Sequence, residues 1–177
     1  MKHSVTLITG GSRSGKSAYA LTLLEQAENK AFLATAEAID DEMQGRIQAH
    51  KKERGEEFQT IEEPVKIWEV LKSLSNDIEI IVVDCLTVWL GNLQYHLDDE
   101  KKEAEAIESF LSVLSNPPCE VIVVTNELGM GIIPENPLVR RFRDEAGRLN
   151  QKVAALADKV VLTVSGIPMV IKDSTRD

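Results

Sequence analysis

Residues 10–17 combine the side chains of a phosphate-binding loop in the order Gly-Gly-Ser-Arg-Ser-Gly-Lys-Ser. Gly10 and Gly15 permit backbone angles that a Cβ would forbid, so main-chain N–H groups can turn inward around phosphate oxygens. Lys16 would reach the β- and γ-phosphates of a nucleoside triphosphate, and the hydroxyl of Ser17 would ligate Mg²⁺. A β-rich run precedes the segment and a helical stretch follows it, as a P-loop requires.

A second candidate ligand for Mg²⁺ is Asp84, which follows the apolar run Ile-Ile-Val-Val at residues 80–83. Such a run fits a strand buried on both faces, and Asp84 would lie at its carboxyl end. The carboxylate could hold the metal directly or through water. Many strands end in aspartate, so it is the combination with residues 10–17 that favours this role.

A candidate nucleophile, His50, lies in a polar stretch that is compatible with a helix, residues 40–54. Glu42, Arg46, His50 and Arg54 are four residues apart, which on a helix places them in one stripe. A neutral imidazole can attack an α-phosphorus, and neighbouring arginines could disfavour its protonation and stabilise charge on phosphate oxygens. From spacing alone, a solvated helix face that includes a histidine by chance is the simpler explanation. The other histidines, His3 and His96, are expected at the surface.

A third polar cluster follows the apolar run of residues 120–124 and reads Thr-Asn-Glu-Leu-Gly-Met-Gly-Ile-Ile-Pro at residues 125–134. Its position after a strand predicts that it lies at the same sheet edge as residues 10–17. An arginine-rich helical stretch comes next, with Arg140, Arg141, Arg143 and Arg148. These arginines fit two roles equally well, binding of phosphate or carboxylate groups and contact between subunits.

Length and composition predict one globular domain, residues 1–177, with 43% apolar and 28% charged residues. The net charge of −9 argues against nonspecific binding to nucleic acid, which needs clustered cations. The two cysteines have no metal-ligand spacing, and they fit reduced thiols in a cytoplasmic protein. Neither a signal peptide nor an apolar run long enough to span a membrane is expected.

Strand-like and helical patterns alternate along the chain. This alternation predicts an α/β fold of the P-loop NTPase type, a mostly parallel doubly wound sheet with helices on both faces. A turn at residues 166–168 predicts a possible antiparallel edge strand at the C-terminus. The sequence pattern does not determine at which residue within 86–102 the next helix begins. The expected strands are 5–9, 31–36, 58–61, 78–83, 120–125, 159–165 and 169–172, and the expected helices are 17–27, 40–54, 65–74, 101–114 and 137–156.

Taken together, these segments resemble the bifunctional adenosylcobinamide kinase / adenosylcobinamide-phosphate guanylyltransferase family of cobalamin biosynthesis. The P-loop is common to many families, but its combination with Arg-Ile-x-x-His and Asn-Glu-x-Gly-x-Gly-Ile is specific. The resemblance covers nearly the whole chain in the order of the family. The matching segments are 9–17, 34–36, 41–43, Arg46 and Ile47 with His50 and Arg54, 83–87, 125–134, 142–144 and 147–151.

The resemblance implies two activities. One phosphorylates adenosylcobinamide with ATP or GTP, and the other transfers GMP from GTP through a histidine to adenosylcobinamide phosphate, giving adenosylcobinamide-GDP and pyrophosphate. The guanylylated histidine falls on His50, and the family is a homotrimer. The implied nucleotide contacts are Gly10, Gly11, Ser12, Arg13, Ser14, Gly15, Lys16, Ser17, Ala34, Thr35, Ala36, Lys51, Lys52, Glu53, Arg54, Glu62 and Asp84.

Two other functions share part of this pattern. A monofunctional P-loop kinase for a small metabolite would use Lys16, Ser17 and Asp84 and leave His50 without a role. A GTP-dependent switch protein would need an Asn-Lys-x-Asp segment to recognise guanine, and this chain has none.

Overall fold

The computed structural model describes residues 3–25, 27–38, 44–45 and 58–174. Its strands are β1 (Val5–Gly10), β2 (Lys30–Ala34), β3 (Gln59–Glu62), β4 (Ile80–Asp84), β5 (Glu120–Val124), β6 (Lys159–Val164) and β7 (Ile167–Asp173). Its helices are α1 (Lys16–Leu24), α3 (Ile67–Lys72), α4 (Leu86–Leu97), α5 (Glu100–Ser115) and α6 (Pro137–Leu156). The expected helix at residues 40–54 lies largely outside the described residues.

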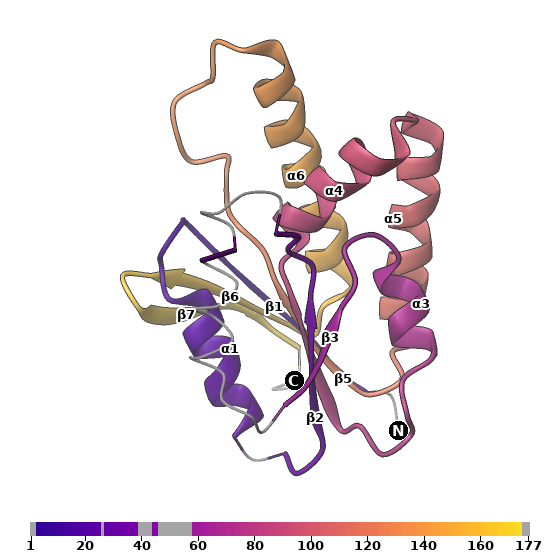
Figure 1. Cartoon of the computed structure of the whole chain (residues 1–177). Coiled ribbons are helices and arrows are strands. Elements are labelled where there is room, and N and C mark those ends of the chain that lie inside the picture. Colours follow the sequence, from indigo (N-terminus) through magenta and orange to yellow (C-terminus); the bar gives the residue numbers. More distant parts are fainter. Residues whose placement is uncertain (1–2, 26, 39–43, 46–57, 175–177) are drawn as a thin grey trace.

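The strands form one seven-stranded sheet in the order β3-β2-β4-β5-β1-β6-β7 (Figure 1). Every pairing is parallel except that of β6 with β7, which is antiparallel. The predicted doubly wound sheet and its antiparallel C-terminal edge are therefore confirmed. Because parallel strands deliver their carboxyl ends to one edge, β1, β2, β3, β4 and β5 present the loops that follow them side by side.

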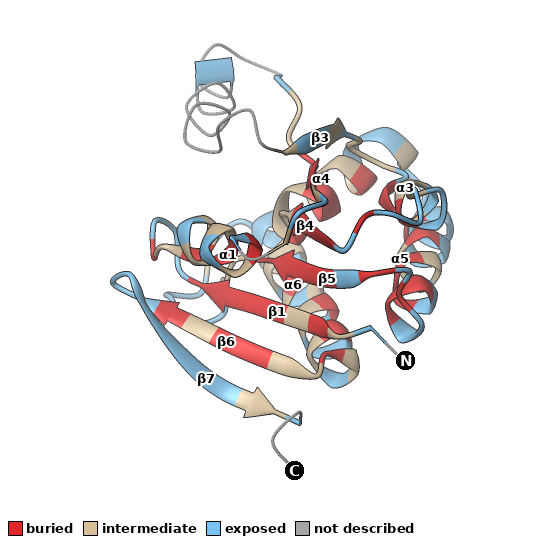
Figure 2. Ribbon diagram, turned by 90° about the horizontal axis from the view of Figure 1, so that it is seen from below, coloured by how far each residue is buried: buried red, intermediate tan, exposed pale blue. Residues whose placement is uncertain are grey.

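Helices cover both faces of the sheet, as predicted. Successive side chains of a strand point to opposite faces, so Leu7 belongs to the hydrophobic cluster that contains side chains of α3, α4, α5 and α6, whereas Ile8 belongs to the cluster that contains side chains of α1. On β4, Val83 likewise belongs to the first of these clusters and Val82 to the second. Figure 2 shows β1 and β5 buried over much of their length and β7 exposed at the margin. The continuous apolar runs read from the sequence are thus strands covered on both sides.

The segment left open in the sequence, residues 86–102, contains all of helix α4 and the start of α5. Helix α4 ends at Leu97, and its C-cap residue Asp98 has a left-handed φ of 44°. Asp99 then caps α5, because its side chain accepts hydrogen bonds from the N–H groups of Lys101 and Lys102. The existence of α4 as a separate helix is therefore a finding of the structure. No helix among the described residues is long and apolar enough to cross a membrane.

Candidate nucleotide and phosphate site

Residues 10–17 form a loop that joins β1 to the first turn of α1. Gly10 and Gly15 have φ values of 152° and 95°, which favour glycine and explain the glycine positions of the motif. The Nζ atom of Lys16 donates to the carbonyl oxygens of Gly10 at 3.1 Å and Gly11 at 2.7 Å. Lys16 is only 8% exposed, and burial lowers the pKa of its ammonium group. The loop therefore holds a cation over its own main chain, at the amino end of a helix.

The β6–β7 hairpin supports this loop from the side. The hydroxyls of Ser14 and Thr163 share a hydrogen bond of 2.7 Å, and Gly166 N–H donates to Ser14 O at 2.9 Å. A Cβ on Gly10 would lie 2.5 Å from the carbonyl oxygen of Thr163, and one on Gly15 would lie 3.0 Å from Gly166 Cα. Two glycines of the loop are thus required by backbone that approaches from the far end of the chain. Sequence analysis did not find Thr163 or Gly166, since their role depends on a turn and a strand pairing.

Asp84 lies at the carboxyl end of β4 and contacts the P-loop directly. Ser17 Oγ donates to Asp84 Oδ2 at 2.8 Å, so the two predicted magnesium ligands are neighbours. Oxygen ligands from one or two side chains, completed by water and phosphate oxygens, are the usual surroundings of Mg²⁺ in such enzymes. The described part of the chain contains no group of three or more His, Cys, Asp or Glu side chains able to hold a metal ion. A metal shared with a bound triphosphate fits this pair of oxygens better than a site made by protein alone.

The carboxyl end of β2 is bonded to that of β4. Thr35 N–H donates to Asp84 O at 3.1 Å, and the buried hydroxyl of Thr35 donates to Cys85 O and accepts from Cys85 N–H, both at 2.9 Å. The pairing register places Ala34 beside both Asp84 and Glu62. The residues predicted to contact nucleotide on β2, β3 and β4 therefore share one sheet edge.

Cys85, whose main-chain atoms bond to Thr35, is joined to Asp84 by a cis peptide bond. Desolvation, and secondarily the charge of Asp84, raise the pKa of the Cys85 thiol to about 12. The thiol stays protonated near neutral pH, so Cys85 is no candidate nucleophile. Its main-chain atoms are what tie the strand ends together.

The segment after β5 lies beside the P-loop, as its position in the sequence predicted. Glu127 N–H donates to Gly10 O at 3.0 Å, and Asn126 N–H donates to Thr87 Oγ1 at 2.9 Å. From α6, Asn150 Nδ2 donates to Asn126 O at 3.1 Å, and Asn150 Oδ1 accepts from the hydroxyl of Thr125 at 2.8 Å. These contacts fix the start of the loop next to the phosphate site.

The arginines of α6 make contacts that sequence analysis did not anticipate. Arg140 donates to the carbonyl oxygens of Pro134 at 2.9 Å and Glu135 at 2.6 Å, which closes the loop onto its own helix. Arg141 lies 2.7 Å from a carboxylate oxygen of Glu145 and 3.0 Å from one of Glu100. Within the described residues, these two side chains thus serve intrachain contacts, a third role beside the two expected ones.

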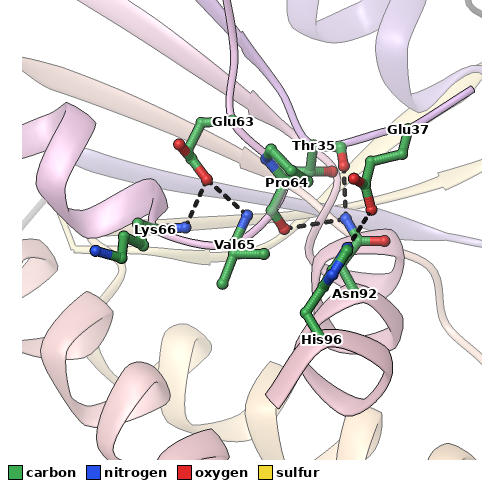
Figure 3. Close-up of polar contacts among 8 residues, drawn as sticks. All are labelled: Thr35, Glu37, Glu63, Pro64, Val65, Lys66, Asn92 and His96. Carbon is green, nitrogen blue, oxygen red and sulfur yellow. Dashed lines mark hydrogen bonds and ion pairs between the residues drawn. The ribbon is translucent and has the colours of Figure 1, made fainter.

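His50 lies outside the described residues, and so do Lys51, Lys52, Glu53 and Arg54. The structure describes the chain on both sides of this stretch, residues 27–38 before it and residues 58–174 after it. His96, one of the two histidines expected at the surface, contacts a residue of the first of these two segments (Figure 3). His96 Nε2 lies 2.6 Å from Glu37 Oε2, and the histidine side chain is 35% exposed.

Residues 6–171 match the model of a family described as cobinamide kinase / cobinamide phosphate guanyltransferase. The chain belongs to this family. A relative from Escherichia coli K12, named bifunctional adenosylcobalamin biosynthesis protein CobU, is 38% identical over 94% of this chain and 98% of its own. The corresponding protein CobP of Pseudomonas aeruginosa PAO1 is 41% identical over 94% and 96%. The resemblance noted from the motifs is therefore confirmed over nearly the full length of both relatives.

Solved structures place this member of the cobinamide kinase / guanyltransferase family on a widespread fold. A KaiC-like protein of Pyrococcus horikoshii OT3 superposes with a TM-score of 0.53 at 17% identity, over 91% of this chain and 71% of that one. The RadB recombinase superposes with a TM-score of 0.53 at 16% identity, over 91% and 74%. At these identities the likeness shows the fold alone, and it agrees with the predicted P-loop NTPase type.

Proposed function

We propose that this chain performs both reactions for which its family is named, phosphorylation of adenosylcobinamide and guanylyl transfer to the resulting phosphate. The observation that carries the proposal is the junction of Lys16, Ser17 and Asp84 at one sheet edge, in a chain that matches the family from residue 6 to residue 171. Displacement at phosphorus depends mainly on positioning and on neutralising charge. A buried cation and two adjacent oxygen ligands provide those means.

In the kinase reaction, Lys16 and the main-chain N–H groups of residues 10–17 would hold the triphosphate of ATP or GTP. Ser17 and Asp84 would hold Mg²⁺, which when bound neutralises charge on the phosphate oxygens. The hydroxyl oxygen of adenosylcobinamide attacks the γ-phosphorus and gives up its proton to solvent, the bond from the γ-phosphorus to the bridging β-phosphate oxygen breaks, and the nucleoside diphosphate leaves. No covalent enzyme intermediate is needed.

In the transferase reaction, we assign the nucleophile to His50. An imidazole nitrogen attacks the α-phosphorus of GTP, the bond to the β-phosphate oxygen breaks, and pyrophosphate leaves. A phosphate oxygen of adenosylcobinamide phosphate then attacks the same phosphorus, and the P–N bond breaks to give adenosylcobinamide-GDP. The attack requires a neutral imidazole, whose unprotonated nitrogen carries the lone pair that forms the P–N bond.

The test is to incubate the protein with α-labelled GTP and to look for an acid-labile adduct. We expect the mass of one GMP on the peptide that contains His50, no adduct in His50→Ala, and an unchanged adduct in the matched variant His3→Ala. Kinase turnover of His50→Ala should stay close to that of the wild type. Absence of label from the wild type with kinase turnover intact would favour the monofunctional kinase.

The resemblance also leads us to propose a homotrimer. Sedimentation equilibrium at micromolar concentration should give three times the chain mass of 19.6 kDa. A monomer at concentrations where both activities are present would contradict it.

A further inference from the structure

The loop between β5 and α6, residues 125–136, is held against α6 near both of its ends. Near its start, Asn150 Nδ2 donates to Asn126 O at 3.1 Å. Near its end, the Arg140 guanidinium donates to Pro134 O at 2.9 Å. Both anchors belong to α6, so the flank of the helix that carries them faces the loop.

Arg143 and Gly147 lie on this flank. With about 3.6 residues in each turn, both positions fall between Arg140 and Asn150, along the helix and around it. Apart from its own neighbours in the helix, no described atom lies within 4 Å of where a Cβ on Gly147 would be, so the flank is open there. The Arg143 side chain is only 19% exposed, and within the described residues its guanidinium makes one polar contact, with the adjacent Asp144 at 3.3 Å. A guanidinium has five N–H donors, so most of them remain for a ligand.

This flank of α6 begins beside the phosphate loop and extends beyond it. Glu127 N–H donates to Gly10 O at 3.0 Å, so the start of the β5–α6 loop touches the P-loop. Helix α6 leads to β6, which begins at the opposite edge of the sheet because it runs parallel to β1, so the residues before Asn150 lie progressively further beyond the carboxyl ends of the strands (Figure 1). Arg143 precedes Asn150 by seven residues, about 10 Å along the helix axis. Arg143 is thus placed to bind a second substrate rather than the triphosphate.

We propose that Arg143 binds the phosphate group of adenosylcobinamide phosphate. The inference rests on the proposed function, which supplies this substrate. The planar fork of a guanidinium fits two oxygens of a phosphate, and at a mostly buried side chain solvent screens the pair less than at the surface. Adenosylcobinamide has a neutral hydroxyl in place of this phosphate and gives the guanidinium no anionic oxygen. Arg143 is therefore a specificity-determining residue that favours the phosphorylated corrinoid, the product of the first reaction and the acceptor of the second.

The test compares the binding of two ligands that differ only in this phosphate, adenosylcobinamide phosphate and adenosylcobinamide. In equilibrium dialysis read from the absorbance of the corrinoid, the wild type should bind the phosphorylated ligand about 10- to 100-fold more tightly, since hydrogen bonds to charged groups are among the stronger ones. Arg143→Gln should remove most of this preference and leave the Kd values for adenosylcobinamide and for GTP within about twofold of the wild type. Arg143→Lys keeps the charge but loses the planar fork, so it should retain only part of the preference.

The matched control is Arg148→Gln, an arginine of the same helix. Arg148 is exposed and lies on another side of α6, where it lines a cavity together with residues of α5. This variant removes the same charge from the same helix, so a general effect of lowering the positive charge would appear in it as well. We expect all three Kd values of Arg148→Gln to equal those of the wild type.

Four results would overturn the role of Arg143. They are equal Kd values for the two corrinoids in the wild type, an unchanged preference in Arg143→Gln, weaker binding of GTP in that variant, and a change in its sedimentation with its preference intact. The third result would assign the side chain to the nucleotide, and the fourth would assign it to a subunit contact. If Arg143→Gln fails to fold, Arg143→Lys decides, and an unchanged preference there would overturn the inference. A wild-type protein that binds neither corrinoid would refute the proposed function itself.

Discussion

The two halves of the sheet edge are held together in different ways. Around β1, the phosphate loop is fixed by its own glycines, by Lys16 folding back onto Gly10 and Gly11, and by the β6–β7 turn. Around β2 and β3, the strand ends are fixed by side chains that bridge distant segments: Thr35, just after β2, bonds to Cys85, and Asn92 of α4 bonds to Thr35 O. The P-loop half therefore combines a short local motif with one distant support, the β6–β7 turn, whereas the ends of β2 and β3 are held mainly by contacts between residues far apart in the sequence.

The prediction with the largest expected effect distinguishes one phosphate site used by both reactions from a separate site for each reaction. Lys16→Ala removes the buried cation of the loop, and loss of such a charge-stabilising donor costs about 100- to 1,000-fold in rate. We expect both kinase turnover and GMP incorporation to fall by that order, whereas Lys152→Ala should leave both unchanged. Loss of one activity alone would show that the other reaction uses a different phosphate site.

The next effect concerns folding of the P-loop half. Gly15→Ala puts a side chain at a φ of 95° with its Cβ 3.0 Å from Gly166 Cα, so strain and contact with backbone add. We expect the free energy of unfolding to fall by about 3 kcal/mol in urea denaturation. Gly11→Ala is the matched control, because nothing lies within 4 Å of its Cβ and the change should stay within about 0.5 kcal/mol. Equal effects at the two glycines would mean that the hairpin does not constrain the loop.

The same contrast explains what the sequence could predict. The apolar runs of β1, β4 and β5 identified a buried parallel sheet, and the order Gly-x-x-x-x-Gly-Lys-Ser identified the loop, because both signals are local. The pairing of Ser17 with Asp84 followed from the shared sheet edge. In contrast, Thr163, Asn92 and His96 carry no pattern of their own. Their roles depend on strand pairing and on α4, a helix that sequence periodicity did not separate from α5.

A smaller effect tests the β2–β3 half. Thr35→Val keeps the shape of the buried side chain but removes the hydroxyl bonded to the N–H and carbonyl of Cys85. An unsatisfied buried main-chain group should lower the free energy of unfolding by about 1–2 kcal/mol. Thr22→Val, on the exposed side of α1, is the matched control, and its change should be about 0.5 kcal/mol or less. A Thr35→Val protein as stable as the wild type would mean that this link does not hold the strand ends.

The smallest effect is a pH dependence that belongs to the P-loop half alone. Burial lowers the pKa of Lys16 in the folded state, so the unfolded chain binds this proton more tightly. Stability of the wild type should therefore rise as pH increases through the folded pKa towards the ordinary value, with the effect absent at lower pH, where Lys16 is charged in both states. In Lys16→Met no such gain is possible. The difference in unfolding free energy between the two proteins, measured by urea titration from pH 7 to pH 10, should shift in favour of the wild type. A constant difference over that range would show that the ammonium group is solvated, and that the phosphate loop holds its cation at no cost in the absence of nucleotide.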